Sequence, residues 1–267
     1  MKLEAAVYTH VGLVRQNNED NFYLRGILRQ DLQQQSVQLK HRGHDRLALF
    51  AVADGMGGEE NGELASLVTV QNLKSASIPE VRQQATESIF RANQLICDEM
   101  SQNGGKRMGS TLAAVYIDDR KAMCCNVGDS RVYLFRKNVL QQISVDHTQV
   151  QQLVRSGVLT AQEARKHKQR HVLTQNIGIS PQELEIEPAF SEPIPLVHGD
   201  VFLLCSDGLT DMVTDEQIAQ VLCCGGAPAK LAEDLVELAL KQGGRDNVTA
   251  MVVRVYRGRY LFFDREG

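Results

Sequence analysis

Residues 47–55 read LALFAVADG, seven consecutive apolar residues that run directly into an aspartate and a glycine. The apolar run is continuous rather than alternating, which is typical of a strand covered on both faces. The same arrangement recurs in CCNVGD (124–129) and VFLLCSDG (201–208), and in reverse order in GGRDNVTAMVVRV (243–255), where the aspartate precedes the strand. The pattern predicts buried strands that each present an aspartate at one end.

The aspartates at these strand ends carry the chemical argument. One aspartate at a turn is usually a turn former, but several at one edge of a packed sheet repel one another unless cations neutralise them. Carboxylate oxygens without histidine or cysteine suit Mg²⁺ or Mn²⁺ better than Zn²⁺, and Gly55, lacking a Cβ, lets its carbonyl approach an ion. Two such ions about 4 Å apart share a water and direct it at phosphorus. The predicted chemistry is hydrolysis of a phosphoester.

A charged motif near the N-terminus, RQNNED (15–20), supplies complementary groups. The guanidinium of Arg15 is suited to a bidentate grip on a phosphoryl group. Glu19 and Asp20 have the chemistry to bind ions directly or through waters. Taken alone, the motif reads as an ordinary charged turn, so its interpretation depends on the aspartates elsewhere.

The remaining pattern predicts blocks of strands that alternate with blocks of helices, which favours an α+β fold with packed antiparallel sheets and outer helices. Strands are predicted at 5–8, 21–24, 47–53, 111–117, 121–127, 132–135, 139–143, 184–186, 201–205 and 247–256, and helices at 62–76, 80–102, 146–168, 215–222 and 227–241. Residues 25–46 contain the run Gln33-Gln34-Gln35 and a basic cluster, and they exceed a tight turn in length. We interpret them as an insertion-like loop or hairpin.

Composition bounds the class of protein. The chain has 267 residues with 43% apolar and 23% charged residues, which fits one globular domain over 1–267. A net charge of −4 and the absence of Trp argue against a nucleic-acid partner. Six cysteines without a C-x-x-C pair, and no apolar run near the ~20 residues that span a bilayer, predict a reduced, cytoplasmic protein with no membrane partner.

Seven blocks of the sequence resemble one family in order from end to end, the metal-dependent serine/threonine protein phosphatases of type 2C (PPM family), in particular their compact bacterial members. The blocks are RQNNED (15–20), DGMGGEENGELAS (54–66), MGSTLAAV (108–115), NVGDSRVYLFR (126–136), DHTQVQQLVRSGVLTAQEARKHKQRHVLTQNIG (146–178), LLCSDGLTDMV (203–213) and GGRDNVTAMVV (243–253). The resemblance implies a four-layer α/β/β/α sandwich, with two antiparallel sheets flanked by helices and a metal site between the sheets at one end.

The resemblance also implies roles for individual residues. Two core Mg²⁺ or Mn²⁺ ions would be held by a shared carboxylate, a carbonyl and further acids, namely Asp54, Gly55, Asp207 and Asp246, with Asp20 nearby. A weaker third ion would bind Asp129, Asp207 and Asp211. Arg15 resembles the family's phosphate clamp, so Arg15, Asp54 and Asp207 are the implied catalytic residues. Residues 150–175 resemble the flap segment that influences substrate choice.

The implied function is hydrolysis of phosphoserine and phosphothreonine in proteins by a metal-activated water. The implied partners are phosphoproteins and the bacterial Ser/Thr kinases that modify them, and the protein is expected to be a monomer. Some relatives carry a histidine at one of two positions near the site, and this chain has Met56 and Glu59 at those positions. The leaving oxygen would therefore be protonated by a metal-bound water, with His147 and His171 as alternatives.

Three alternative interpretations remain. Residues 125–131 fit the C-x-x-G-x-x-R loop of cysteine-dependent tyrosine phosphatases, but Asp129 would face the phosphate and the next residues read as a strand rather than a helix. A non-catalytic relative that binds phosphoproteins would have lost its acids, and this chain keeps them. A phosphatase dedicated to one regulatory phosphoprotein, such as an anti-sigma-factor antagonist, is compatible with the sequence.

Overall fold

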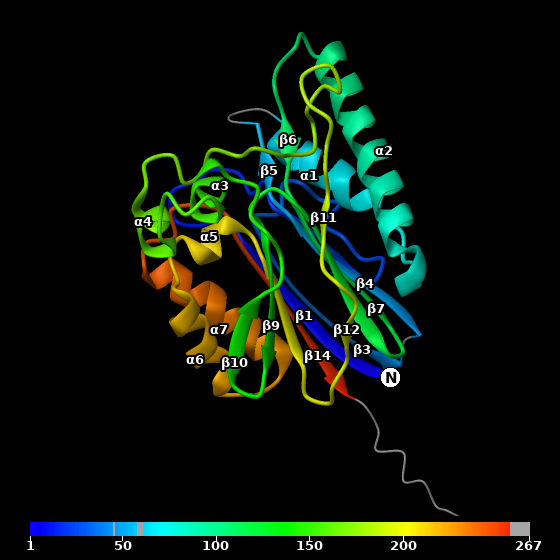
Figure 1. Cartoon of the computed structure of the whole chain (residues 1–267), viewed down its shortest axis with the longest axis vertical. Helices are drawn as coiled ribbons and strands as arrows, with labels where there is room; N and C mark the ends of the chain where they lie inside the picture. The colour runs from blue at the N-terminus through cyan, green and yellow to red at the C-terminus, as the bar shows by residue number, and fades with distance from the viewer. Residues whose placement is uncertain (45, 58–60, 257–267) are drawn as a thin grey trace, which may run out of the picture.

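Two six-stranded antiparallel sheets lie face to face in the computed structural model, which describes residues 1–44, 46–57 and 61–256 (Figure 1). The first sheet has the order β10-β9-β13-β14-β1-β3, formed by Val139–Gln142, Arg131–Arg136, Val201–Cys205, Val248–Tyr256, Lys2–His10 and Ser36–His44. The second has the order β11-β8-β7-β4-β2, formed by Ala189–Phe190, Lys121–Val127, Leu112–Asp118, Leu47–Ala53 and Asn21–Leu24, with β12 (Ile194–Pro195) also paired to β8.

Helices cover the outer face of each sheet, as Figure 1 shows. The second sheet packs against α1 (Gly62–Gln71) and α2 (Val81–Gln102), which follows the short 3₁₀ turn Ile78–Glu80. The first sheet packs against α5 (Asp207–Thr210), α6 (Asp215–Cys223) and α7 (Pro228–Lys241). The predicted four-layer α/β/β/α sandwich is confirmed. None of the helices in the described ranges has the length and apolarity needed to cross a bilayer.

Strand β4 shows why the decisive apolar run is continuous. Its alternate residues Leu49, Ala51 and Ala53 belong to the core under α1 and α2. Ala48, Phe50 and Val52 belong to the core between the sheets, where Phe50 is fully buried. Because both faces are covered, neither face of the strand tolerates polar residues. The side chains of strand β14 alternate in the same way between the core that lies between the sheets and the core under α7.

Two segments differ from the sequence-based prediction. Residues 36–44, within the segment interpreted as an insertion-like loop or hairpin, form β3, which extends the first sheet by pairing with β1 from Lys2↔His44 to His10↔Ser36. The strand predicted at 184–186 is absent from the described structure, since a turn that begins at Ser180 continues to Leu184. The neighbouring strands β11 and β12 lie further along the chain.

The predicted helical pair at 146–168 is two short helices, α3 (Gln149–Arg155) and α4 (Ala161–Lys166). The predicted capping box at the start of α4 is present, because Thr160 and Glu163 bond each other's backbone N–H groups. Val150 is the only buried residue of α3, and α4 has none.

One end of the sandwich collects the strand ends of interest. Strands β4, β8 and β13 run toward this end, and β14 starts there. Because β1 ends opposite the start of β14, at His10↔Val248, the RQNNED loop that follows β1 reaches the same end.

Candidate metal centre

A cavity of about 550 Å³ lies at this end of the sandwich, and we call it the acid-lined cavity. The predicted site residues, with the exception of Asp20, line it: Arg15, Asp54, Gly55, Asp129, Asp207, Asp211 and Asp246. Its lining therefore includes aspartates that follow β4, β8 and β13 and one that precedes β14. Residues far apart in the chain meet here because the strands that carry them end at the same edge.

Glycine at position 55 is a steric requirement. The Gly55 N–H donates to the Glu19 carbonyl over 3.2 Å. A Cβ at this position would collide with the carbonyl oxygens of Glu19 and Gly62. On the other side of Asp54, Thr111 accepts a hydrogen bond from the Asp54 N–H at 3.0 Å. The backbone around Asp54 is therefore fixed from both sides.

Asp129 is placed by the glycine before it. Gly128 has φ +90°, and a Cβ there would lie 2.7 Å from the Thr111 Cγ2 atom. Both the backbone conformation and the close approach exclude other residues. The Thr111 and Ser130 hydroxyls hydrogen-bond at 2.7 Å and fix the turn that carries Asp129.

Asp207 and Asp211 bracket the single turn of α5 and share a histidine. The Nδ1 atom of His171 lies 3.5 Å from Asp207 Oδ2, and its Nε2 atom lies 3.3 Å from Asp211 Oδ2. The hydrogen bond with Asp207 raises the pKa of His171. Ligand atoms of Asp129, His171 and Asp207 lie within 4.8 Å of one another, so His171 joins the predicted third-ion residues.

Arg15, the first of the predicted site residues in the chain, contacts Asp246, the last of them. Its Nη2 atom donates to Asp246 Oδ2 over 2.7 Å. The Asn247 side chain beside it accepts from the Glu19 N–H at 2.8 Å. The RQNNED loop is thereby attached to the start of β14.

Asp20, which the prediction placed near the core ions, does not line the acid-lined cavity, whereas its neighbour Glu19 does. Asp20 is fully buried, and its Oδ2 atom accepts hydrogen bonds from Ser206 at 2.7 Å and Thr249 at 2.6 Å. Its Oδ1 atom is buried without a hydrogen-bond partner in the described structure. Glu19, which the predicted ligand set omitted, lines the acid-lined cavity. The sequence signal for Glu19 was its carboxylate within the RQNNED motif.

Burial and mutual repulsion shift the pKa values of these carboxyl groups. Burial and the charges of Asp207 and Asp246 raise the pKa of Asp20 to about 7, although the hydrogen bonds from Thr249 and Ser206 oppose that rise. Burial and the charge of Glu63 raise the pKa of Glu19 to about 7. Burial and neighbouring aspartates raise the pKa of Asp54 and of Asp129 well above the usual range. Against burial, hydrogen bonds with His171 and Asp54 keep the pKa of Asp207 low. A cluster of this kind favours cations.

The remaining candidate residues from the sequence are Met56, Glu59, His147 and Cys125. Met56 lines the acid-lined cavity, and Glu59 lies outside the described residues. His147 does not line the cavity, since its Nδ1 atom accepts from the Gly128 N–H at 3.3 Å, and burial lowers its pKa. Cys125 is fully buried in β8, burial raises its pKa, and the strand β9 follows rather than a helix. The structure therefore rejects the cysteine-phosphatase loop.

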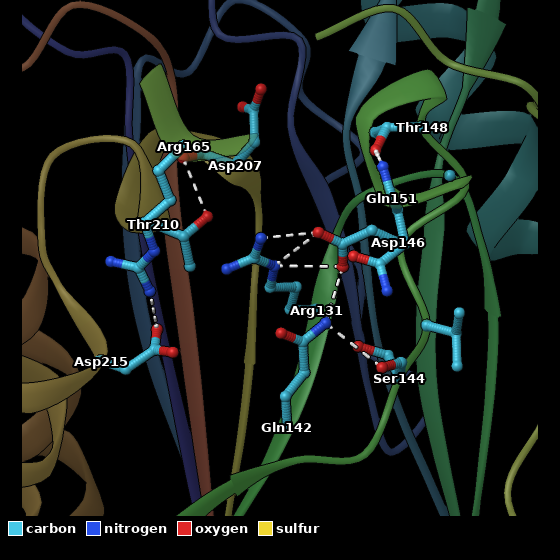
Figure 2. Close-up of polar contacts among 12 residues, drawn as sticks. Arg131, Gln142, Ser144, Asp146, Thr148, Gln151, Arg165, Asp207, Thr210 and Asp215 are labelled. Atoms are coloured by element: carbon cyan, nitrogen blue, oxygen red, sulfur yellow. Dashed lines mark hydrogen bonds and ion pairs between the residues drawn. The ribbon is translucent and has the colours of Figure 1, made fainter. Parts of the chain in front are cut away.

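A second cavity of about 680 Å³, here called the flap cavity, adjoins the first and shares Asp129, Asp207 and Asp211 with it. Figure 2 shows the polar contacts that line it. Arg131 makes a bidentate contact with Asp146, with Nη2 2.6 Å from Oδ2 and Nε 3.1 Å from Oδ1. Arg165 of α4 reaches Asp215 at the start of α6 over 3.0 Å. The Arg165 pair attaches the flap segment, residues 150–175, to α6, and the Arg131 pair fixes the chain just before that segment.

Comparison with known proteins identifies the family. The sequence matches the Protein phosphatase 2C family over residues 9–153. Protein phosphatase PhpP of Streptococcus pneumoniae is 34% identical over 260 residues, which covers 94% of this chain and 97% of PhpP. The crystal structure of the Mycobacterium tuberculosis serine/threonine phosphatase PstP/Ppp is 34% identical with a TM-score of 0.80, and the match covers 96% of this chain and 100% of that chain.

A further solved structure bears on metal content. It is the catalytic domain of PstP in complex with two manganese ions, 32% identical with a TM-score of 0.78, over 96% of this chain and 100% of that one. The two-sheet sandwich and the acid-lined cavity define a metal-dependent phosphatase. The chain belongs to the protein phosphatase 2C family, and its activity is metal-dependent dephosphorylation of serine and threonine residues in proteins.

Proposed function

We propose that the acid-lined cavity binds two core ions, Mn²⁺ or Mg²⁺, and a weaker third. The proposed core ligands are Asp54 as the shared carboxylate, the Gly55 carbonyl, Asp207 and Asp246, with Asp20 and Glu19 close behind. The proposed third-ion ligands are Asp129, Asp207 and Asp211, with His171 beside them. The observation that carries the proposal is the convergence of aspartates from four strand ends on one cavity.

The chemistry of the donor set supports hard cations. Apart from His171, the groups proposed as ligands are oxygens, which Mg²⁺ and Mn²⁺ prefer. The Asp20 Oδ1 atom is buried without a hydrogen-bond partner among the described residues, a costly arrangement that a nearby cation would relieve. Burial raises the pKa values of Asp54 and Asp129, and the charges of neighbouring aspartates raise them further.

Bound ions of this type activate a water for attack on phosphorus and neutralise charge on the phosphoryl oxygens. The chain's own residues supply the rest. Arg15 has five N–H donors in a planar fork and lines the cavity, so we assign it to orient the phosphoryl group. We assign protonation of the leaving oxygen to solvent water, because His147 lies behind Gly128 and His171 is engaged by two aspartates.

The substrates are phosphoproteins, and we propose that bacterial Ser/Thr kinases supply them and that the phosphatase acts as a monomer. The relatives' names as serine/threonine phosphatases support the first proposal. Light scattering on the purified protein measures its mass in solution. A mass of two chains or more would contradict the monomer.

The test of the proposed site is hydrolysis of pSer, pThr and pTyr peptides with Mn²⁺ or with EDTA. We expect hydrolysis of pSer and pThr peptides with Mn²⁺, loss in EDTA and little effect of iodoacetamide, because the thiol of Cys125 is buried. Asp54→Asn should abolish turnover, whereas Asp234→Asn on the exposed surface of α7 serves as the control. Near-normal turnover of Asp54→Asn at saturating Mn²⁺ would remove the shared-carboxylate assignment.

A further inference from the structure

Arg29, in the segment that precedes β3, is a buried cation that the proposed mechanism does not use. Its side chain is only 2% exposed, and no carboxylate forms an ion pair with it in the described part of the chain. Burial lowers the pKa of Arg29, although the charge of Asp20 opposes that effect. A buried charge without an ionic partner is an expensive way to stabilise a fold, and an apolar side chain of similar size would serve stability better.

The guanidinium of Arg29 donates all five of its N–H groups to backbone carbonyls. Nη2 donates to Asn18 at 2.6 Å and to Asp20 at 2.8 Å, and Nε donates to Asp20 at 3.2 Å. Nη1 donates to the carbonyls of Leu32 at 3.3 Å and Gln34 at 3.0 Å. Arg29 therefore joins the RQNNED loop to the stretch of chain that leads into β3.

The peptide groups held in this way are those that carry the acids of the site. The carbonyls of Asn18 and Asp20 lie on either side of Glu19, whose side chain lines the acid-lined cavity. The Glu19 carbonyl in turn accepts from the Gly55 N–H at 3.2 Å. The position of Arg29 is itself fixed, because its backbone N–H and C=O both bond the Asn21 side chain, at 3.1 and 3.0 Å.

We infer that Arg29 is a positioning residue for the metal centre. It fixes the backbone at 18–20 so that Glu19 faces the cavity and Asp20 lies buried next to it in a set orientation, and it places a permanent positive charge near Asp20. The inference rests on the proposed function, because it assumes that these acids serve bound ions. It also gives a role to the 25–46 segment: this segment supplies the rear support of the site, in addition to a strand at the sheet edge.

The test compares Mn²⁺ binding, measured by isothermal titration calorimetry, in the wild type and in Arg29→Met and Arg29→Lys. We expect Arg29→Met to bind Mn²⁺ about tenfold or more weakly, the range found when supporting groups behind metal ligands are removed. Arg29→Lys keeps the charge but cannot reach both loops with a planar fork, so its affinity should lie between the two. Turnover should recover at high Mn²⁺ more fully in Arg29→Lys than in Arg29→Met.

The matched control is Arg136→Met. Arg136 makes two hydrogen bonds to Asp200 and one to the Pro195 carbonyl at the opposite end of β9 from Asp129. Its loss should lower the melting temperature but leave the Mn²⁺ affinity within about twofold of the wild type. This control separates loss of stability from loss of positioning.

Unchanged Mn²⁺ affinity in both Arg29 variants would overturn the inference, and so would an equal weakening in Arg136→Met. If Arg29→Met does not fold, Arg29→Lys decides between the outcomes by the same titration. Wild-type protein that binds no Mn²⁺ would instead contradict the proposed function. The two failures are therefore distinguishable.

Discussion

At the scale of single residues, we expect Arg15 to matter for phosphate binding and to contribute little to the stability of the fold. Its ion pair with Asp246 joins two side chains that are 53% and 37% exposed, and pairs of this kind contribute only about 0.2–1 kcal/mol. Removal of Arg15 should therefore leave the fold intact. Its effect should appear in the handling of the phosphoryl group, because Arg15 lines the acid-lined cavity and is the proposed phosphate-binding residue.

We accordingly predict that Arg15→Ala raises the KM for p-nitrophenyl phosphate by roughly tenfold, a loss of about 1.4 kcal/mol of binding. Arg15→Lys should recover only part of it, because an ammonium cannot make the bidentate contact. Steady-state kinetics at saturating Mn²⁺ measure both variants. The control is Arg42→Ala, which removes a 2.7 Å ion pair with Glu4 on β1. Unchanged KM in both Arg15 variants would make Arg15 a surface residue without a catalytic role.

A second prediction concerns the proposed weak third ion. Asp211 contacts His171 and lies one helical turn beyond Asp207, at the far end of α5. Asp211→Ala should leave two tight Mn²⁺ sites, remove the weak one and lower turnover. Calorimetric titration counts the sites, and assays over a range of Mn²⁺ concentrations measure the activity. Loss of all ions together would show that the tight and weak sites are not separate.

At the scale of elements, the flap segment is attached by few contacts. Val150 is the only buried residue of α3, α4 has none, and the side of α4 that meets α6 relies on the exposed pair of Arg165 with Asp215. A segment with so little apolar burial opens at low cost in free energy. Movement of α3 and α4 would change access to the flap cavity, whereas Arg170 and His171, which follow α4, contact Asp211 and Asp207 directly.

The next prediction follows from the weak attachment of α3 and α4. Arg165→Ala should change kcat/KM severalfold for a phosphoprotein and much less for p-nitrophenyl phosphate, for which we expect the proposed metal ligands and Arg15 to suffice. Lys166→Ala, one residue along the same exposed helix, is the matched control because Lys166 does not line the flap cavity. Equal factors for the two substrates would mean that α4 is simply a solvated helix.

The elements show what local sequence determines. Strands β4, β13 and β14 were predicted because both their faces are buried, which makes their sequences apolar throughout. Strand β3 was not predicted because it is an edge strand, and only Val37 and Leu39 of its nine residues pack against the core. Strands β11 and β12 have two residues each, too few to produce a pattern.

The site divides in a similar way. Aspartates that directly follow a strand were found because strand and turn are both local features. The roles of Asp20 and Glu19 could not be separated, because their orientations depend on Ser206, Thr249 and the tight approach of Gly62. Contacts such as those of Arg29 with the Asn18 and Asp20 carbonyls depend on the folded backbone, and side-chain type alone gives no sign of them.

At the scale of the whole molecule, the acid cluster makes stability depend on metal and pH together. In the metal-free protein, burial and neighbouring charges raise the pKa of Asp20 and Glu19 to about 7, from ordinary values of 3.8 and 4.5. The folded chain then binds more protons than the unfolded chain between those values. Its free energy of unfolding therefore falls as pH rises through this window, and the full penalty is present above about pH 7. Bound divalent ions act in the opposite direction, because they favour the ionised carboxylates of the folded state.

The last prediction follows from these opposing effects. In EDTA, the melting temperature should fall by roughly 5–10 °C between pH 6 and pH 8, since a few kcal/mol corresponds to a shift of this size in a chain of this length. Saturating Mn²⁺ should recover most of that loss at pH 8 and have a smaller effect at pH 6. Asp20→Asn removes one of the buried titrating groups, so the EDTA curve of this variant should be flatter, while Asp234→Asn on exposed α7 should follow the wild type. Scanning calorimetry measures all three proteins. A metal-free melting temperature that rises from pH 6 to pH 8 would mean that these carboxyl groups do not govern the stability of the folded chain.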